Sequence, residues 1–158
     1  MSDNENKNVF ISHYGKDDDS VQGLKKLLAN NGYTLRNSSI DSTKPNEAKN
    51  EDYIKQLLRE KMKWAGSAIV LIGPETHTRE WVNWEIELAY RLGKPIVGVF
   101  MQGATDSDVP ESFEKYGDAL VGWRSDKIID ALEGNYNQWS NSTGEPWAGK
   151  FTPSREVC

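Results

Sequence analysis

The stretch Ser67-Ala68-Ile69-Val70-Leu71-Ile72, followed by Gly73 and Pro74, decides the fold. It is short and continuously apolar, as strands are when helices cover both faces of a parallel sheet. Gly73 and Pro74 end it, because this pair of residues favours a turn. We therefore expect a buried strand over residues 67–72.

Strand and helix patterns alternate in both directions from this segment. On the N-terminal side they predict a strand over residues 8–12, a helix over 18–31, a strand over 33–36 and a helix between Asn50 and Gly66. On the C-terminal side they predict a helix between Thr78 and Gly93, a strand over 95–100, a short helix beginning near Asp108, a strand over 119–122 and a helix over 125–133. Five strands alternating with about five helices predict a doubly wound α/β sheet.

The chain is 158 residues long, which fits one domain with a full core. We assign residues 1–133 to the α/β domain and residues 134–158 to a C-terminal tail without helical or strand periodicity. The tail contains Trp139, Trp147 and Phe151. Because exposed aromatic side chains are costly, we expect the tail to dock on the domain.

The net charge of −5 argues against a nucleic-acid or anionic-membrane surface. No apolar run approaches the roughly 20 residues of a transmembrane helix. The first seven residues are polar and acidic, unlike a signal peptide. The single cysteine, Cys158, allows no internal disulfide. These features predict a cytoplasmic protein without a nucleic-acid or membrane partner.

Ligands of doubly wound sheets bind beyond the carboxyl ends of the strands. Segments 12–15, 36–38 and 73–78 follow those ends, and the helix after residue 78 begins at the same rim. On that helix the neighbours of Glu85 are Trp81, Val82, Leu88 and Ala89, which are all apolar. A carboxylate on an apolar face is costly unless a partner or a ligand offsets it. Glu87 instead has Arg91 one turn downstream, and we expect it to be solvated.

Several familiar sites are excluded by their motifs. The sequence has no glycine-rich dinucleotide or P-loop motif and no G-x-S-x-G elbow. With two histidines and one cysteine, a metal site is not expected. A carboxylate, aromatic side chains and polar loop residues remain, and this set suits cleavage of an N-glycosidic bond. A carboxylate can stabilise the oxocarbenium-like transition state or attack the anomeric carbon.

Four segments, taken in order, resemble a TIR domain. They are Val9-Phe10-Ile11-Ser12-His13-Tyr14 with Asp17-Asp18, Ile69-Val70-Leu71-Ile72, Trp81-x-x-x-Glu85 and Gly93-Lys94-Pro95-Ile96. More narrowly, they resemble the TIR-like subfamily that includes the ThsB proteins of bacterial Thoeris anti-phage systems. The resemblance covers roughly residues 7–133. It implies a flavodoxin-like sheet of five parallel strands with helices on both faces.

The resemblance also implies an activity of the NAD glycohydrolase or ADP-ribosyl cyclase type. NAD is then the substrate, nicotinamide is released, and no separate cofactor is needed. The ADP-ribose part is cyclised or conjugated into a signal that activates a downstream effector protein, and a homo-oligomer is compatible with this scheme. The family's catalytic glutamate falls on Glu85, and its preceding aromatic residue falls on Trp81. The remaining substrate-binding residues that we assign are Phe10, Ser12, His13, Arg36 and Ser38.

Other interpretations remain open at this stage. Glu85 can be a structural carboxylate paired with Arg36 or Arg79, and Arg36 can bind phosphate or pair with a surface acid. Trp84 stands where other TIR domains often carry a polar residue, and we expect it to be a core residue. Two other functions stay possible: a non-catalytic TIR-like interaction module, and a nucleoside deoxyribosyltransferase-like enzyme.

Overall fold

The computed structural model describes residues 5–13, 18–37, 51–74, 80–141 and 145. Its elements are β1 (Glu5–Ser12), α1 (Asp18–Ala29), β2 (Tyr33–Asn37), α2 (Glu51–Trp64), β3 (Ser67–Ile72), α3 (Glu80–Arg91), β4 (Ile96–Phe100), the 3-10 helix η4 (Asp106–Asp108), α4 (Glu111–Tyr116), β5 (Ala119–Val121) and α5 (Ser125–Leu132). The predicted alternation of strands and helices is confirmed, and the strand predicted over residues 67–72 has the predicted bounds.

The five strands form one sheet in the order β2-β1-β3-β4-β5. All four neighbouring pairs are parallel. This strand order is the one found in flavodoxin-like sheets, with a switch point between β1 and β3. The central strand β3 is buried along its whole length, which accounts for its continuously apolar sequence.

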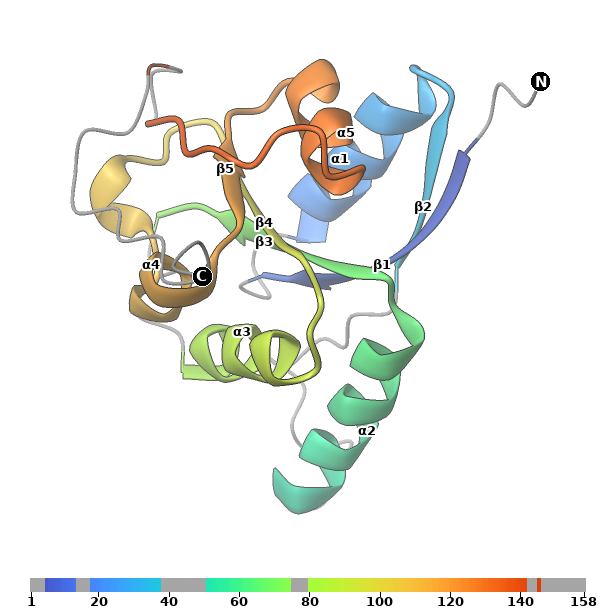
Figure 1. The fold of residues 1–158 in the computed structure, drawn as a ribbon, viewed down its shortest axis with the longest axis vertical. Helices are drawn as coiled ribbons and strands as arrows, with labels where there is room; N and C mark the ends of the chain where they lie inside the picture. Colours follow the sequence, from blue (N-terminus) through green and yellow to red (C-terminus); the bar gives the residue numbers. More distant parts are fainter. Residues whose placement is uncertain (1–4, 14–17, 38–50, 75–79, 142–144, 146–158) are drawn as a thin grey trace.

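Helices cover both faces of the sheet, as Figure 1 shows. Helices α1 and α5 lie on one face, and α2, α3 and α4 lie on the other. Alternate residues of each strand supply the two apolar cores. On β1, Phe10 belongs to the core under α2 and α3, whereas Val9 and Ile11 belong to the core under α1 and α5.

Strand β1 begins three residues before its predicted start. Its polar residues Glu5, Asn6 and Lys7 pair with β2, in a register that sets Glu5 opposite Tyr33 and Lys7 opposite Leu35. Ladder hydrogen bonds use backbone groups, so a polar stretch can extend a strand at the side of a sheet. Apolar patterning alone does not detect such an extension.

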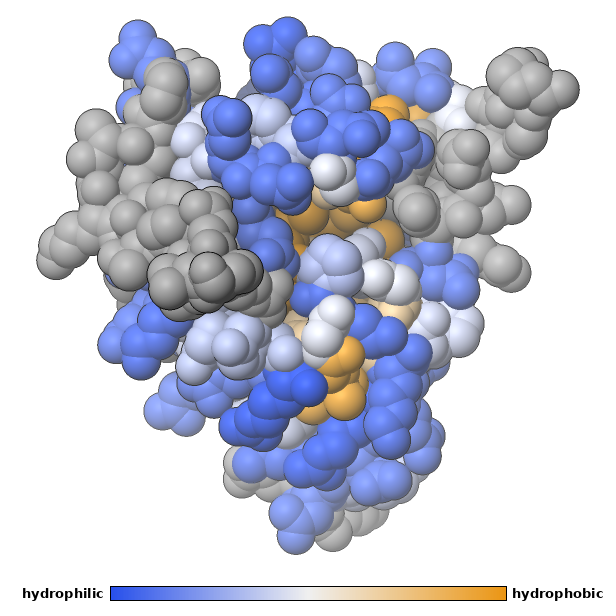
Figure 2. All heavy atoms as spheres, in the orientation of Figure 1, coloured by the Kyte–Doolittle hydropathy of each residue, from blue (hydrophilic) through white to orange (hydrophobic). Residues whose placement is uncertain are grey.

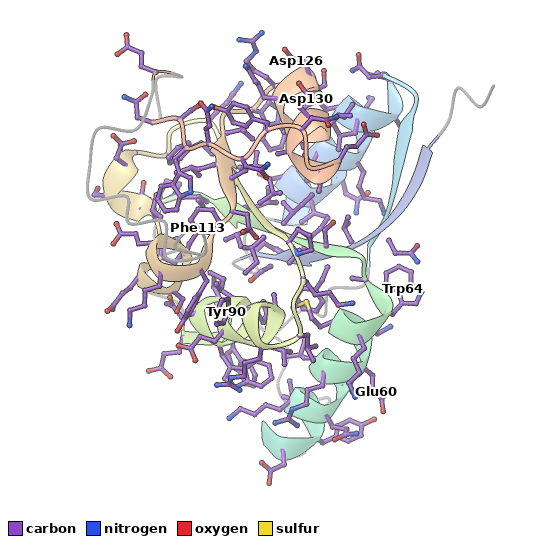
Figure 3. The ribbon with its side chains drawn as sticks, viewed as in Figure 1. Glu60, Trp64, Tyr90, Phe113, Asp126 and Asp130 are labelled. Carbon is purple, nitrogen blue, oxygen red and sulfur yellow. The ribbon has the colours of Figure 1, made fainter. Side chains whose placement is uncertain are left out.

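Part of the tail packs against β5. The Leu120 N–H donates to the Gln138 carbonyl at 3.1 Å, and the Ser140 N–H donates to the Leu120 carbonyl at 2.8 Å. These bonds form a parallel bridge between Leu120 and Trp139. Trp139 is only 5% exposed, and the centroid of its ring lies 5.1 Å from that of Phe113. Phe113 belongs to α4 and is labelled in Figure 3. The expected burial of a tail tryptophan is confirmed for Trp139, while Trp147 and Phe151 lie outside the described residues. The division at residue 133 stays a prediction.

Phe113 also packs against Gly98 on β4. A Cβ atom added to Gly98 would lie 2.7 Å from the Phe113 ring and 2.9 Å from Leu120. A side chain at position 98 would therefore require the Phe113 ring to shift. No helix in the described part of the chain has the length and apolar character needed to span a membrane.

Candidate active site

Glu85 is a buried carboxyl on the sheet-facing side of α3. That side also buries Val82, Ile86, Leu88 and Ala89. The Glu85 residue is 4% exposed, as the apolar character of its helical neighbours predicts. The Glu87 side chain is 44% exposed and pairs with Arg91 at 3.5 Å. The two glutamates therefore occupy opposite environments on one helix, as expected.

The partner of Glu85 is Ser12, the last residue of β1. Because side chains alternate along a strand, Ser12 shares the face of Phe10, which is the face covered by α3. Ser12 is 2% exposed, and its hydroxyl donates a hydrogen bond of 2.5 Å to Glu85 Oε1. This contact joins the carboxyl end of β1 to the second turn of α3. It brings together two of the predicted site residues.

Burial has a larger effect on the pKa of Glu85 than the hydrogen bond from Ser12. Desolvation raises the pKa of Glu85 from 4.5 to about 8, and the Ser12 hydrogen bond opposes part of that rise. The carboxyl is therefore largely protonated at neutral pH when no cation lies beside it. A positively charged ligand placed against it would favour the carboxylate again.

His13 directly follows Ser12 at the same rim and is 9% exposed. Its Nδ1–H donates to the Ile11 carbonyl at 3.2 Å. In a neutral imidazole this bond assigns the proton to Nδ1 and leaves Nε2 as an acceptor. The assignment of His13 to substrate binding stays a prediction.

The two aromatic site residues lie at different depths. Trp81 is half-buried one turn before Glu85, and its ring meets the ring of Trp84 edge-on, with centroids 5.8 Å apart and an interplanar angle of 77°. Phe10 is fully buried in the core under α2 and α3. Direct contact of either ring with a substrate stays a prediction.

The side chains of two predicted site residues, Arg36 and Ser38, lie outside what the structure describes. Arg36 belongs to β2, but its side chain is outside the described residues, and so are Ser38 and Arg79. The alternative pairing of Glu85 with Arg36 or Arg79 is therefore not tested. Within the described residues, no group of three or more histidine, cysteine, aspartate and glutamate side chains is arranged to hold a metal ion.

The prediction that Trp84 is a core residue is confirmed only in part, because Trp84 packs against the edge of the core under α2 and α3. Trp84 is only half-buried, and two cations of α2 lie over its ring. Lys55 Nζ is 5.4 Å and Arg59 Cζ is 5.8 Å from the ring centroid. The contact of these cations with Trp84 crosses between two helices, so periodicity along either helix does not predict it. The four-residue spacing of Lys55 and Arg59 indicates only that both cations lie on one face of α2.

A cavity of about 350 Å³ lies at the opposite rim of the sheet, where β4 and β5 begin. Pro95, Val97 and Asp118 line it together with the end of α5. Figure 2 shows apolar surface at the centre of the face it displays, surrounded by hydrophilic residues. None of the predicted site residues whose side chains the structure describes lines this cavity.

Comparisons with known proteins give two kinds of likeness. The CMP N-glycosidase BcmB from Clostridium botulinum aligns with a TM-score of 0.47 and 16% identity, over 80% of this chain and 98% of that one. A 3-dehydroquinate dehydratase-like protein from Bifidobacterium longum aligns with a TM-score of 0.41 and 11% identity, over 82% and 94%. At these values neither likeness carries an inference about chemistry.

No curated protein matches the sequence at a significant level. The family described as Thoeris protein ThsB, TIR-like domain, matches residues 10–106. This match spans more than half of the chain and contains Ser12 and Glu85, so the chain belongs to the ThsB TIR-like family.

Proposed function

We propose that this protein cleaves NAD and makes an ADP-ribose-derived signal in bacterial anti-phage defence. The observation that carries the proposal is the buried Glu85 carboxyl, held by Ser12 at the carboxyl end of β1, within a domain of the ThsB TIR-like family. Burial raises the pKa of Glu85 to about 8, and carboxyls with strongly perturbed pKa values cluster at functional sites.

The reaction breaks the bond between the ribose anomeric carbon and the nicotinamide nitrogen. The bonding electrons move to the nitrogen, so the pyridinium leaves as neutral nicotinamide and positive charge develops on the ribose. Glu85, as a carboxylate, stabilises this charge or bonds to the anomeric carbon. Water or a hydroxyl of a second group then attacks, loses a proton, and gives linear, cyclic or conjugated ADP-ribose.

The environment of Glu85 suits a cationic substrate. Without a cation beside it, the neutral carboxyl avoids the cost of a buried charge. The positively charged nicotinamide ring of NAD would offset that cost and favour ionisation. The substrate would therefore help to generate the carboxylate that the reaction requires. In this scheme Trp81 and Phe10 shape the nicotinamide pocket. The ribose or the phosphates are contacted by Ser12, His13, Arg36 and Ser38. The product acts on a downstream effector protein in the cytoplasm, and the enzyme can act as a homo-oligomer.

The test is incubation with NAD, with and without lysate of phage-infected cells, followed by mass spectrometry of the products. Glu85→Gln keeps the size and hydrogen-bonding reach of the side chain but removes its charge. We expect nicotinamide release to fall by about 10²-fold or more, the scale for losing a key electrostatic group. Glu87→Gln is the matched control, and its activity should equal that of the wild type because the Glu87 side chain is solvated.

Three outcomes would overturn the proposal. Equal NAD cleavage by the wild type and Glu85→Gln would remove Glu85 from the reaction. Cleavage of deoxynucleosides in place of NAD would favour the nucleoside deoxyribosyltransferase-like alternative. No turnover of either substrate, with or without the lysate, would favour a non-catalytic interaction module.

A further inference from the structure

The cavity where β4 and β5 begin has walls that are partly apolar and partly acidic. Its volume of about 350 Å³ lies within the range of small-molecule sites. Four apolar residues, two glycines, two carboxylates and one amide line it: Pro95, Val97, Ala131 and Leu132, then Gly93 and Gly134, then Asp118, Glu133 and Asn137. None of these described lining residues is a lysine or an arginine, so the side-chain charges of the wall are all negative.

Two glycines leave open space at the wall. Gly93 and Gly134 have φ angles of 73° and 82°, in the left-handed region that glycine adopts without strain. A Cβ atom added at either position would meet nothing within 4 Å. The chain therefore turns after α3 and after α5 without a side chain that would narrow the cavity at these two positions.

Two helices end at the cavity and add to its negative potential. Helix α3 ends at Arg91, two residues before Gly93, and α5 ends at Leu132, which lines the wall itself. The C-terminus of a helix carries a partial charge of about −0.5. Both helix ends therefore favour a cation in the cavity.

The cations that are nearest to the wall in sequence have other partners. Arg91 pairs with Glu87 at 3.5 Å, and Lys94 Nζ donates to the Lys63 carbonyl at 3.3 Å. Both residues lie beside Gly93 in the chain, but neither lines the cavity. A cation that enters the cavity would therefore meet the carboxylates without competition from these two side chains.

Asp118 is fixed at the wall by the backbone of Ile96. Its Oδ2 atom accepts a hydrogen bond of 2.8 Å from the Ile96 N–H, and its own N–H donates to the Ile96 carbonyl at 2.8 Å. A carboxylate has about four acceptor positions, so Asp118 can accept from a ligand while it keeps the bond to Ile96. Its position does not depend on the ligand.

We infer that this cavity binds a small organic cation, namely an ammonium group on a short alkyl stem. The ammonium group binds Asp118 and Glu133, and the stem packs against the apolar wall formed by Val97 and Leu132. The apolar wall favours such a ligand over a metal ion, and the described residues contain no group of three metal-binding side chains. This site is separate from Glu85, so the inference holds whether or not the protein cleaves NAD.

The experiment titrates the full-length protein with butylamine and follows its backbone amides by NMR at constant pH and ionic strength. We expect saturable shifts of the amide signals of Gly93, Gly134 and Asn137. Two further probes separate the parts of the ligand. Butanol keeps the stem without the charge, ammonium chloride keeps the charge without the stem, and each should bind at least tenfold more weakly than butylamine.

The variants remove the two carboxylates without changing their size. Asp118→Asn/Glu133→Gln should bind butylamine about tenfold more weakly than the wild type, since two charge pairs are lost. The carbonyl oxygen of asparagine can still accept from the Ile96 N–H. Glu133→Gln alone changes an exposed residue and should weaken binding about threefold, which keeps the test valid if the double variant does not fold. Asp130→Asn is the matched control, because Asp130 is an exposed carboxylate of α5 (Figure 3) that does not line the cavity.

Four results would overturn the inference. The wild type could show no saturable shift with butylamine, or Glu133→Gln and Asp130→Asn could bind it equally. Equal binding of butanol would mean that the cavity holds apolar groups without regard to charge. Equal binding of ammonium would mean that the carboxylates attract any cation and that the apolar wall has no part in recognition.

Discussion

Glu85 and Glu87 are two residues apart on α3, and the helix turns them into opposite surroundings. A step of two residues rotates a side chain by about 200° around the helix axis. Glu85 therefore enters the sheet-facing core beside Ser12, while Glu87 reaches solvent and Arg91. Burial penalises the charged form of Glu85 and raises its pKa to about 8.

The difference in stability between Glu85→Gln and the wild type should depend on pH, because the wild type has a carboxyl that titrates and the variant does not. Between pH 4.5 and about 8, the unfolded chain ionises this carboxyl while the folded protein keeps it protonated. The contribution of Glu85 to stability is thus fully present below pH 4.5 and is lost as pH rises toward 8. Relative to the wild type, the variant should gain roughly 1 kcal/mol in free energy of unfolding for each pH unit in this window. Denaturant unfolding at several pH values measures the gain. A pH-independent difference, like that expected for Glu87→Gln, would contradict the raised pKa.

Ser12→Ala should move the pH dependence of catalysis. The Ser12 hydroxyl favours the ionised form of Glu85, so its removal should raise the pKa of Glu85 further. If the reaction needs the carboxylate, the rise of kcat/KM with pH should shift to higher pH in the variant. Ser12→Thr keeps the hydroxyl and should shift the profile less. A lower rate at every pH without a shift would mean that Ser12 only supports the local structure.

At the scale of elements, local patterns predict what each segment forms but not which segments meet. The neighbours of Glu85 along α3 are enough to predict its burial, because helical periodicity fixes them. Ser12 is 73 residues away in sequence, so its contact with Glu85 depends on how β1 and α3 pack. The same holds for Lys55 and Trp84, which meet across two helices. Periodicity also misses the polar start of β1, because backbone pairing with β2 forms it.

The packing of α4 against β4 gives a stability prediction. Gly98→Ala would place a Cβ atom 2.7 Å from the Phe113 ring and 2.9 Å from Leu120. Overpacking of this kind costs about 1–3 kcal/mol, so the melting temperature should fall by several degrees. Gly122→Ala is the control, since a Cβ atom there meets nothing within 4 Å. Calorimetry compares the two variants, and an unchanged melting temperature in Gly98→Ala would show that Phe113 can move away at little cost.

At the scale of the whole molecule, the parallel sheet separates a candidate active site from a cavity. Glu85, Ser12 and His13 lie where strands end, whereas the cavity of about 350 Å³ lies where β4 and β5 begin. The alternation of strands and helices is enough to predict the rim of the candidate site, because it places all carboxyl ends on one side of the sheet, but it does not predict the cavity. The contacts of the tail could not be predicted in the same way, since residues 134–158 follow no period and only their aromatic side chains indicate burial.

Truncation after Glu133 should destabilise the protein. It removes the buried Trp139 ring and the two backbone bonds to Leu120. Loss of a buried tryptophan side chain costs about 3–5 kcal/mol, so the melting temperature should fall by several degrees or more. Trp139→Ala in the full chain should reproduce much of the loss, and Trp64→Ala should cost less because Trp64 is 44% exposed. Thermal unfolding of the three variants is the measurement, and a truncated protein as stable as the full chain would mean that the tail contributes nothing to folding.

The bridge between the tail and β5 also closes an open side of the sheet. In a strand, the N–H and the carbonyl of one residue point to the same side, and those of its neighbours point to the other. In the three-residue strand β5, the outward pair belongs to Leu120, and both groups are bonded to the tail. An outer strand with unpaired backbone groups is a template for intermolecular strand addition and aggregation. Because the tail occupies the outward backbone groups of Leu120, a strand of another molecule cannot pair with them while the tail is bound.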